Sequence, residues 1–327
     1  MAGDWVLGVD IGGTNVVVGL VPAEGGPAAG VRGRAMVGGA EASVMVEHIA
    51  RMTRDSMEEV FQAHSGGRVV GVGVGCPGDL DIAGGSVVAA HNLGWFDVPL
   101  RDLMSDALGL PAVLENDANC ATYGEWWQGA GQGFRTLVGV TLGTGIGGGI
   151  VLDGVLFRGA SGTVAEFGHT TINYTGRRCT CGNYGCLEAY ASGPNIAARA
   201  REGLEAGAES ALAALVDGDL DAITAVTVYE ALVEGDEYAH EVMVETARIL
   251  GVGVANIINV LNPDAVVIVG GVTRAGDHLF RPLRSEVRKR AFGRSEAACR
   301  IIPGALPETA GVVGAAGVFL SEASRGD

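Results

Sequence analysis

Lysine is nearly missing from this sequence of 327 residues. Its one lysine, Lys289, lies in the charged segment LRSEVRKRAF, which is predicted to form an exposed helix face far from every glycine-rich turn. A P-loop requires a Gly-Lys-Ser/Thr run, and a protein-kinase site requires a lysine on a strand. The scarcity of lysine therefore excludes both of these nucleotide-binding classes.

Positive charge is scarce altogether, since 22 Lys and Arg residues face 38 Asp and Glu residues and give a formal net charge of −16. Nucleic-acid binding requires a basic stripe, and the same Coulombic repulsion disfavours anionic membrane surfaces. The N-terminus does not resemble a secretory signal, and no apolar run is expected to be long enough to span a membrane. We predict a soluble, cytoplasmic protein with neither nucleic-acid nor membrane partners.

Cysteine is also infrequent, yet three of the six cysteines fall within CTCGNYGC, residues 179–186. In a reducing compartment such a cluster is more typical of a metal site than of disulfides, and the other three cysteines are scattered like ordinary buried thiols. Zinc prefers a tetrahedral set of thiolates and imidazole. The pattern favours zinc at Cys179, Cys181 and Cys186, with one ligand position left open.

Long linkers rich in Ser or Pro are absent, and strand-like and helix-like patterns alternate along the chain. Because single hydrophobic cores stop growing near ~250–300 residues, this length predicts about two domains, which abut across a cleft. We place the cut near Glu115. Amphipathic helices are predicted at residues 41–63 and 243–261, the second ending at an Asn-Pro stop.

Three apolar runs contain or end on glycine-rich turns. WVLGVDIGGTNVVVGLV indicates strand, turn and strand, LVGVTLGTGIGGGIVLDG repeats this plan, and DAVVIVGG ends a buried strand. Glycines let backbone N–H groups approach phosphate oxygens, although one such turn alone is more often a plain hairpin. A Rossmann turn opens a helix, whereas the β-branched run after the first turn favours a strand. The dinucleotide-binding class is therefore excluded as well.

Together, DIGGTN, LGTGIGGG and VIVGG resemble the phosphate-one, phosphate-two and adenosine motifs of the sugar-kinase, hexokinase and actin superfamily. Within it, EFGH at 166–169 followed by CTCGNYGCLE resembles the ROK family, named for repressors, open reading frames and kinases, and NLGW at 92–95 adds support for its glucokinase branch. The resemblance implies an α/β fold of two ribonuclease-H-like domains flanking a cleft. The implied domains are residues 1–115, joined by a C-terminal helix at 309–327, and residues 116–308, which carry the zinc loop.

The resemblance also implies that ATP and magnesium bind at the glycine turns. Asp10 would organise magnesium through water, although a strand-end Asp could instead simply hold the turn. Backbone donors and hydroxyls would hold the phosphates, and the third turn would leave room for adenosine. The implied nucleotide contacts are Asp10, Gly12, Gly13, Thr14, Asn15, Thr144, Gly145, Gly270 and Gly271.

By the same resemblance, His169 joins the three clustered cysteines as fourth ligand of a closed, structural zinc site. Its other ring nitrogen would donate to a sugar hydroxyl. Glu166 and Glu188 would accept hydrogen bonds from further hydroxyls, because each buried hydroxyl must find a partner. The alternative is that both glutamates are solvated surface groups.

The segment PAVLENDAN predicts a strand followed by a helix, with Asn116 and Asp117 between them. From the residues alone, Asp117 could be a helix N-cap. The ROK pattern implies that Asn116 orients the sugar and that Asp117 takes the proton from the C6 hydroxyl during attack on the γ-phosphorus. Gly78, in CPGDLD, could meet the sugar through its backbone, or could belong to a turn with no ligand.

We therefore predict ATP-dependent phosphorylation of glucose to glucose 6-phosphate, by a homodimer or homotetramer inferred from family habit. The sugar could instead be mannose, N-acetylmannosamine or fructose, and polyphosphate could replace ATP as donor. A ROK regulator without catalysis would need an N-terminal helix-turn-helix module, for which this sequence offers no segment. An actin-like scaffold would not need Glu166, His169 and Glu188.

Overall fold

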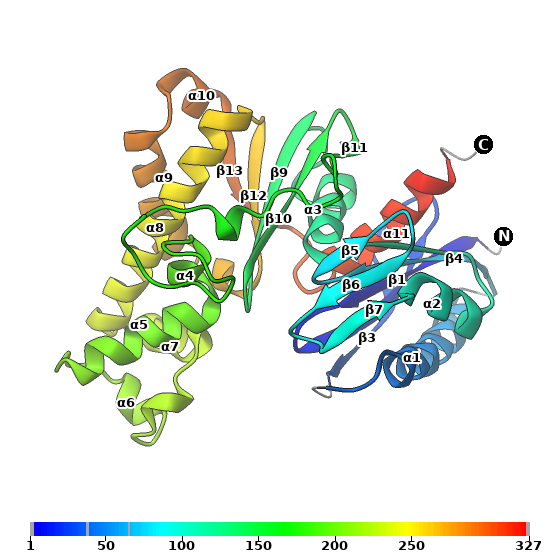
Figure 1. Cartoon of the computed structure of the whole chain (residues 1–327), viewed down its shortest axis with the longest axis horizontal. Coiled ribbons are helices and arrows are strands. Elements are labelled where there is room, and N and C mark those ends of the chain that lie inside the picture. The colour runs from blue at the N-terminus through cyan, green and yellow to red at the C-terminus, as the bar shows by residue number, and fades with distance from the viewer. Residues whose placement is uncertain (1–2, 37–38, 65, 325–327) are drawn as a thin grey trace. The chain divides into compact units, whose positions relative to one another are not determined.

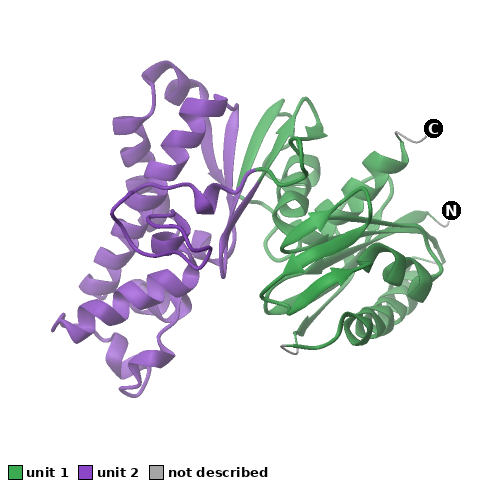
Figure 2. Ribbon diagram, in the orientation of Figure 1, with its two compact units in different colours: residues 1–139, 149–164, 304–327 green, residues 140–148, 165–303 purple. Residues whose placement is uncertain are grey.

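The computed structural model describes residues 3–36, 39–64 and 66–324 (Figure 1). Internal contacts divide the chain into two compact units (Figure 2). Unit 1 consists of residues 1–139, 149–164 and 304–327, and unit 2 consists of residues 140–148 and 165–303. The chain therefore enters unit 1 three times, at its start, in its middle and at its end.

The predicted domain division, with a cut near Glu115, stays a prediction. The compact units differ from it in two respects. Unit 1 includes the helix that begins directly after Asn116, and it includes the segment 149–164. In both descriptions the C-terminal helix belongs with the N-terminal residues.

Unit 1 contains a five-stranded sheet with strand order β3-β2-β1-β4-β8. Its strands are β1 (Asp4–Ile11), β2 (Asn15–Pro22), β3 (Ala29–Ala35), β4 (Arg68–Cys76) and β8 (Ala112–Asn116). β1, β2 and β3 form an antiparallel meander, whereas β4 runs parallel to β1 and β8 parallel to β4. The expected strand, turn and strand around the first glycine turn is thus confirmed. At the carboxyl edge Asp10 is in register with Gly75, and Gly75 is in register with Glu115.

Helices cover both faces of this sheet. They are α1 (Ala42–Ala63), α2 (Leu100–Leu108), α3 (Asp117–Gln128) and α11 (Ala310–Ala323). Because successive side chains of a strand point to opposite faces, β1 contributes to two clusters. Leu7 and Val9 belong to the core that includes α1 and α2, and Val6 packs with the residues of α11. The helix expected at 41–63 is confirmed as α1.

Helix α11 lies unusually close to the backbone of the sheet, because glycines remove the side chains beneath it. A Cβ at Gly8 would lie 2.0 Å from the Val312 carbonyl oxygen, and a Cβ at Gly73 would lie 1.8 Å from that of Ala315. Only glycine fits at such distances. The last helix of the chain is thereby seated directly on its first and fourth strands.

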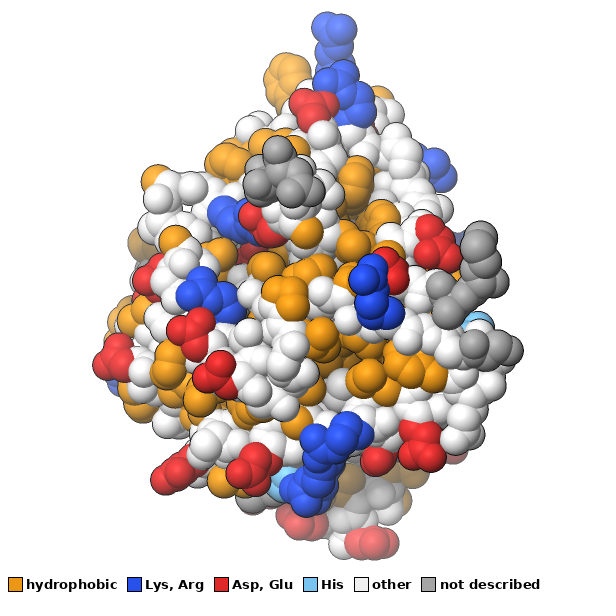
Figure 3. All heavy atoms as spheres, turned by 90° about the vertical axis from the view of Figure 1, so that its right-hand side faces the viewer, with side chains coloured by type: hydrophobic (Ala, Val, Ile, Leu, Met, Phe, Trp, Pro, Cys, Tyr) orange, Lys and Arg blue, Asp and Glu red, His pale blue; other side chains and the backbone are white. Residues whose placement is uncertain are grey.

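A small antiparallel sheet with order β5-β6-β7 completes unit 1. Its strands are β5 (Asp79–Asp81), β6 (Ser86–Ala90) and β7 (Trp95–Val98). Trp95, from the NLGW segment, is 3% exposed and donates its indole N–H to the Ala40 carbonyl oxygen at 2.9 Å. In the face of the molecule shown in Figure 3, basic and acidic side chains are interspersed among hydrophobic ones.

A second five-stranded sheet has the order β11-β10-β9-β12-β13. Its strands are β9 (Thr136–Leu142), β10 (Ile146–Leu152), β11 (Val155–Leu156), β12 (Ala265–Val269) and β13 (Arg300–Pro303). β10 and β11 pair antiparallel, and β12 and β13 pair parallel. The order of the strands along the chain matches that of the first sheet, which confirms the expectation of two similar halves.

The helices of unit 2 lie to one side of its part of this sheet (Figure 2). They are α4 (Glu188–Ala191), α5 (Gly193–Glu205), α6 (Leu212–Leu215), α7 (Ala225–Val233), α8 (Glu237–Leu261), α9 (Asp277–Arg290) and α10 (Gly293–Ala298), with 3-10 helices η1 (Phe167–His169), η2 (Leu220–Ala222) and η3 (Gly271–Ala275). Helix α8 ends at Leu261, and its C-cap residue Asn262 has a left-handed φ of 46°, as the Asn-Pro stop predicts.

The expectation that no apolar run could span a membrane is wrong for α8 by length and composition alone. Among the described residues, this helix of 25 residues is long and apolar enough to cross a membrane. Half of its apolar stretch is buried inside the protein, and Leu250, Val254 and Ile258 lie on its buried side. These features are those of a core helix packed between α7 and α9.

Candidate functional site

The first glycine turn joins β1 and β2 in unit 1. The Gly12 N–H donates to the Asn15 carbonyl oxygen at 2.8 Å, which closes the turn, and a Cβ at Gly13 would lie 3.1 Å from the Asn92 side chain. Thr14 and Asn15 are exposed at the tip. A tight turn with an exposed hydroxyl is suited to receive an anion.

Asp10 ends β1 immediately before this turn. Its carboxylate lies against the first turn of α11, because a Cβ at Gly311 would be 2.2 Å from Asp10 Oδ2. Burial, and to a lesser extent the negative charge of Asp117, raise the pKa of Asp10 to about 7. Two carboxylates at one sheet edge that repel each other are suited to share a cation.

Asn116 and Asp117 join β8 to α3. The Asn116 side-chain oxygen caps the helix, accepting from Ala118 N at 3.0 Å and Asn119 N at 3.1 Å. The residue-based alternative, in which Asp117 is the N-cap, is therefore wrong. Asp117 is the first helical residue, half-buried, and its Oδ1 accepts from Ala118 N at 2.9 Å. The polar group that remains on the Asn116 side chain is its amide nitrogen.

Glu115 is a buried residue of this edge that sequence reasoning missed. It is 1% exposed, and its Oε1 accepts hydrogen bonds from Asn116 N and Asn119 Nδ2, both at 2.9 Å. Its Oε2 receives Arg158 Nε at 2.6 Å, and Arg158 Nη1 lies 2.9 Å from Glu322. A Glu at the end of an apolar strand indicates a buried carboxylate that requires a positively charged partner. The sequence does not identify which Arg is that partner.

Gly78 precedes β5 with φ of 108°, and a Cβ there would lie 2.4 Å from the Ala89 carbonyl oxygen. Pairing of β5 with β6 thus accounts for this glycine. Its contact with a sugar stays a prediction. Among the scattered cysteines, Cys76 and Cys120 are buried as predicted, and burial raises the pKa of both thiols. Cys299 is only half-buried.

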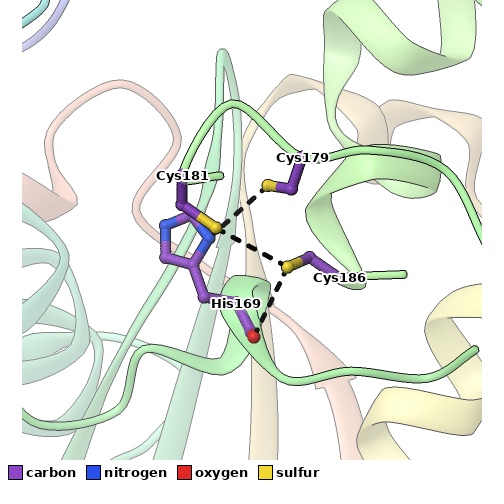
Figure 4. Close-up of side chains that lie close together, drawn as sticks. All are labelled: His169, Cys179, Cys181 and Cys186. Carbon is purple, nitrogen blue, oxygen red and sulfur yellow. Dashed lines mark hydrogen bonds between the residues drawn. The ribbon is translucent and has the colours of Figure 1, made fainter. Parts of the chain in front are cut away.

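In unit 2, His169 and the three clustered cysteines come together, as Figure 4 shows. One ligand atom from each of the four residues lies within 4.8 Å of the others. Cys179 Sγ is 3.8 Å from His169 Nδ1, and Cys181 Sγ is 3.7 Å from Cys186 Sγ. Sulfurs bound at ~2.3 Å in a tetrahedron lie about 3.8 Å apart. The donor set and its spacing therefore fit zinc.

The two glutamates beside this cluster differ in their surroundings. Glu166 is exposed, and its Oε2 lies 4.0 Å from His169 Nε2, the ring nitrogen that faces away from the cysteines. Glu188 is half-buried, and its Oε2 accepts the Ile146 N–H at 2.8 Å. Glu188 is thus not a freely solvated group, whereas the side chain of Glu166 is available to a ligand.

The second and third glycine turns lie together at one edge of the second sheet. The second turn, in which Thr144 is exposed, begins directly after Leu142, the last residue of β9. Gly270, with φ of 115°, follows β12, and a Cβ there would be 2.1 Å from the Leu142 carbonyl oxygen. A Cβ at Gly271 would meet no atom within 4 Å. The predicted phosphate-two and adenosine turns are therefore neighbours.

Two sheets of one plan, each with a glycine-rich hairpin at the edge where its parallel strands end, define a class: the α/β fold of the actin-like ATPases and sugar kinases. Within that class the chain belongs to the ROK family, whose sequence profile matches residues 6–322.

Three relatives illustrate the match. A glucokinase of Halalkalibacterium halodurans is 37% identical over 96% of this chain and 94% of its own length. The crystal structure of a ROK family glucokinase from Streptomyces griseus in complex with glucose and AMPPNP has a TM-score of 0.85 and 36% identity, covering 96% of this chain and 98% of that one. A xylose repressor of Caldicellulosiruptor bescii is 34% identical over 78% of this chain and 63% of its own length. The full-length likeness to glucokinases makes the chain an enzyme of the hexose kinase class.

Proposed function

We propose that the protein transfers the γ-phosphoryl group of ATP to the 6-hydroxyl of glucose, with Asp117 as general base, and releases glucose 6-phosphate and ADP. The observation that carries this proposal is the placement of Asp117 at the start of α3, near enough to Asp10 for its charge to raise the pKa of Asp10. One carboxylate would take the proton and the other would serve the metal of the nucleotide. The likeness to glucokinases supports glucose as the acceptor.

Asp117 would accept the proton of the C6 hydroxyl as that oxygen attacks the γ-phosphorus. Asn116 would orient the sugar through its amide nitrogen, since its oxygen caps α3. In unit 2, Glu166, Glu188 and the Nε2 of His169 would bind further hydroxyls, and the Gly78 backbone would add a contact from unit 1. Each pairing avoids an unsatisfied group, which costs about 1–3 kcal/mol.

Backbone N–H groups and hydroxyls would hold the phosphates, because the chain's single lysine lies in α9. We assign this role to the first turn, Gly12 to Asn15, and to Thr144 and Gly145, and we assign adenosine to Gly270 and Gly271. Magnesium bound with ATP would neutralise phosphate charge, and Asp10 would hold it through water.

We further propose that the Cys3His cluster holds a structural zinc ion, which would keep Glu188 and His169 in place. The supporting observation is the separation of its donor atoms. Metal analysis of purified protein should find about one zinc per chain. Cys186→Ser should lose the metal, whereas Cys299→Ser, outside the cluster, should keep it. Equal zinc in both variants would exclude the assignment.

The test of the reaction is an ADP-release assay with magnesium-ATP and a panel of glucose, mannose, fructose and N-acetylmannosamine. Glucose should give the highest kcat/KM, and Asp117→Ala should lose ~100-fold or more in kcat while it still binds sugar. Preference for another hexose would change the substrate and leave the mechanism. Replacing ATP by polyphosphate tests the donor.

A second candidate, a sugar-binding regulator without catalysis, is favoured by the likeness to the xylose repressor. Sugar binding without sugar-stimulated ATP turnover, in protein shown to contain zinc, would support it over the kinase. A homodimer or homotetramer in the cytoplasm is proposed on family resemblance, and light scattering of the purified protein tests the assembly.

A further inference from the structure

The turn between β9 and β10, taken here with the first residue of β10 as residues 143–146, is held in unit 2 by the segment 168–193, which includes the cysteine cluster. The turn closes on itself through the Gly143 N–H, which donates to the Gly145 carbonyl oxygen at 3.0 Å. From outside, Gly193 N donates to the Gly143 carbonyl oxygen at 2.9 Å. Gly168 packs so closely that a Cβ there would lie 2.1 Å from the Ile146 carbonyl oxygen.

Glu188 makes the contact that involves a charge. Its Oε2 accepts the Ile146 N–H at 2.8 Å, so the carboxylate orients the peptide group between Gly145 and Ile146. A Cβ at Gly145 would lie 2.6 Å from the same oxygen, so a side chain at this position would displace the carboxylate from where it now lies. The two residues therefore belong to one arrangement, although 43 positions separate them in the sequence.

Glu188 contacts both the Cys3His cluster and the helix that follows, α5. It lies two residues after Cys186, and its Oε1 is 4.0 Å from Cys179 Sγ. Its carbonyl oxygen accepts from Asn195 Nδ2 at 2.9 Å. A single carboxylate thus contacts both the cysteine cluster and the turn.

We propose that Glu188 is a positioning residue for nucleotide binding: through the Ile146 N–H it holds the 143–146 turn in the shape that receives phosphate. This role rests on the proposed function and is separate from the sugar contact assigned to Glu188 above. Both partners of this hydrogen bond belong to the chain, so its loss should change nucleotide affinity in an experiment without sugar. Glu166 is exposed and precedes His169 in the sequence, whereas Glu188 follows Cys186. Among the described residues, Glu166 makes no such contact with the turn.

The experiment measures the dissociation constant of magnesium-AMPPNP by calorimetry, without sugar, for wild type, Glu188→Ala, Glu188→Gln and Glu166→Ala. Loss of a charge-assisted hydrogen bond should weaken binding to Glu188→Ala by roughly 10-fold. Glu188→Gln keeps an acceptor oxygen without the charge, so its loss should be roughly 3-fold. Glu166→Ala should match wild type within about twofold, although it should raise the KM for sugar.

Thermal unfolding of each variant shows whether it is folded at the temperature of the titration. If Glu188→Ala is unfolded there, the nucleotide affinity of Glu188→Gln tests the proposal. Equal nucleotide affinity in wild type and both Glu188 variants would overturn the inference, as would an equal loss in Glu166→Ala. If the Glu188 variants lose affinity as expected but wild type phosphorylates no hexose, the positioning role stands and the glucose kinase proposal fails. If wild type does not bind the nucleotide, both fail.

Discussion

Among single residues, Asp10 has a carboxyl group that is costly to ionise where it lies. Its pKa of about 7 stands above the ordinary value of 3.8, first because of burial and then because of Asp117. Between these two values the folded protein holds a proton that the unfolded chain has released. Stability from this group is therefore fully present below pH ~4 and is lost as the pH rises through ~7.

We predict that Asp10→Asn, which cannot ionise, gains stability relative to wild type as the pH rises. The difference in the free energy of unfolding between pH 4.5 and pH 8 should be on the order of 3 kcal/mol in the absence of magnesium. Urea unfolding at both values measures it, with the exposed Asp106→Asn as control. Parallel pH profiles for wild type and Asp10→Asn would show that Asp10 ionises normally in the folded protein.

The ion pair between Arg158 and Glu115 stabilises the strand end that carries Asn116. Removing one partner leaves the other charge buried, at 1% exposure for Glu115. We predict that Arg158→Met costs about 2–4 kcal/mol in the free energy of unfolding, somewhat below a fully buried pair because Arg158 is 22% exposed. Arg135→Met, which breaks an exposed pair with Asp153, should cost no more than about 1 kcal/mol.

Denaturant unfolding compares the two arginine variants directly. The double variant Arg158→Met with Glu115→Gln should recover part of the loss, because no unpaired charge remains buried. Similar small losses in Arg158→Met and Arg135→Met would mean that Glu115 finds another partner or takes up a proton.

At the scale of elements, local patterns predict well and distant partners do not. The glycine hairpins, helix α1 and the end of α8 each follow from a spacing or a stop signal within one segment, and the structure confirms them. The cluster of three cysteines is local as well, whereas His169 came from the family pattern. Arg158 lies 43 residues from Glu115, so their pairing depends on how the segment 149–164 packs in unit 1. No periodicity reports such a contact.

The N-cap of α3 shows that sequence patterns do not identify the exact residue at which a helix begins. Asn116 and Asp117 both have side chains that cap helices, and their order in the sequence does not decide between them. The register of β8 decides it, since the strand ends at Asn116 and the helix begins with Asp117. The cap therefore depends on where the strand stops, which the pairing with β4 sets.

The packing of α11 on the first sheet yields a prediction about one element. At Gly73, a Cβ would meet the Ala315 backbone at 1.8 Å, and neither group can rotate away. Gly73→Ala should therefore push α11 from the sheet and cost about 3 kcal/mol or more. Gly33→Ala, on β3, has only the Val17 side chain at 3.9 Å and should change stability by less than about 1 kcal/mol. Urea unfolding of the pair measures the difference, and equal stabilities would contradict this account of the packing.

Across the whole molecule, the first and last segments of the chain depend on each other. Unit 1 takes its C-terminal part from residues 304–327, and α11 supplies Val312, Val313 and Phe319 to a cluster with Val6 of β1. Glu125, which is fully buried, also binds the incoming segment, accepting from Ala305 N and Leu306 N at 2.9 Å. Unit 1 is therefore incomplete without the segment that carries α11.

We predict that a chain ending at Pro303 does not form unit 1, because the part of the sheet that α11 covers and the glycines beneath it would be exposed to water. The truncated protein should lose cooperative thermal unfolding and should not bind magnesium-AMPPNP, since Asp10 lies against Gly311 of the missing helix. Val312→Asp, which buries a carboxylate in the full-length chain, should act in the same direction, whereas Val226→Asp, at a side chain 62% exposed, should leave stability nearly unchanged. If the truncated chain unfolds cooperatively and binds nucleotide, unit 1 folds without α11. The close packing of α11 at Gly8 and Gly73 would then not be required for folding.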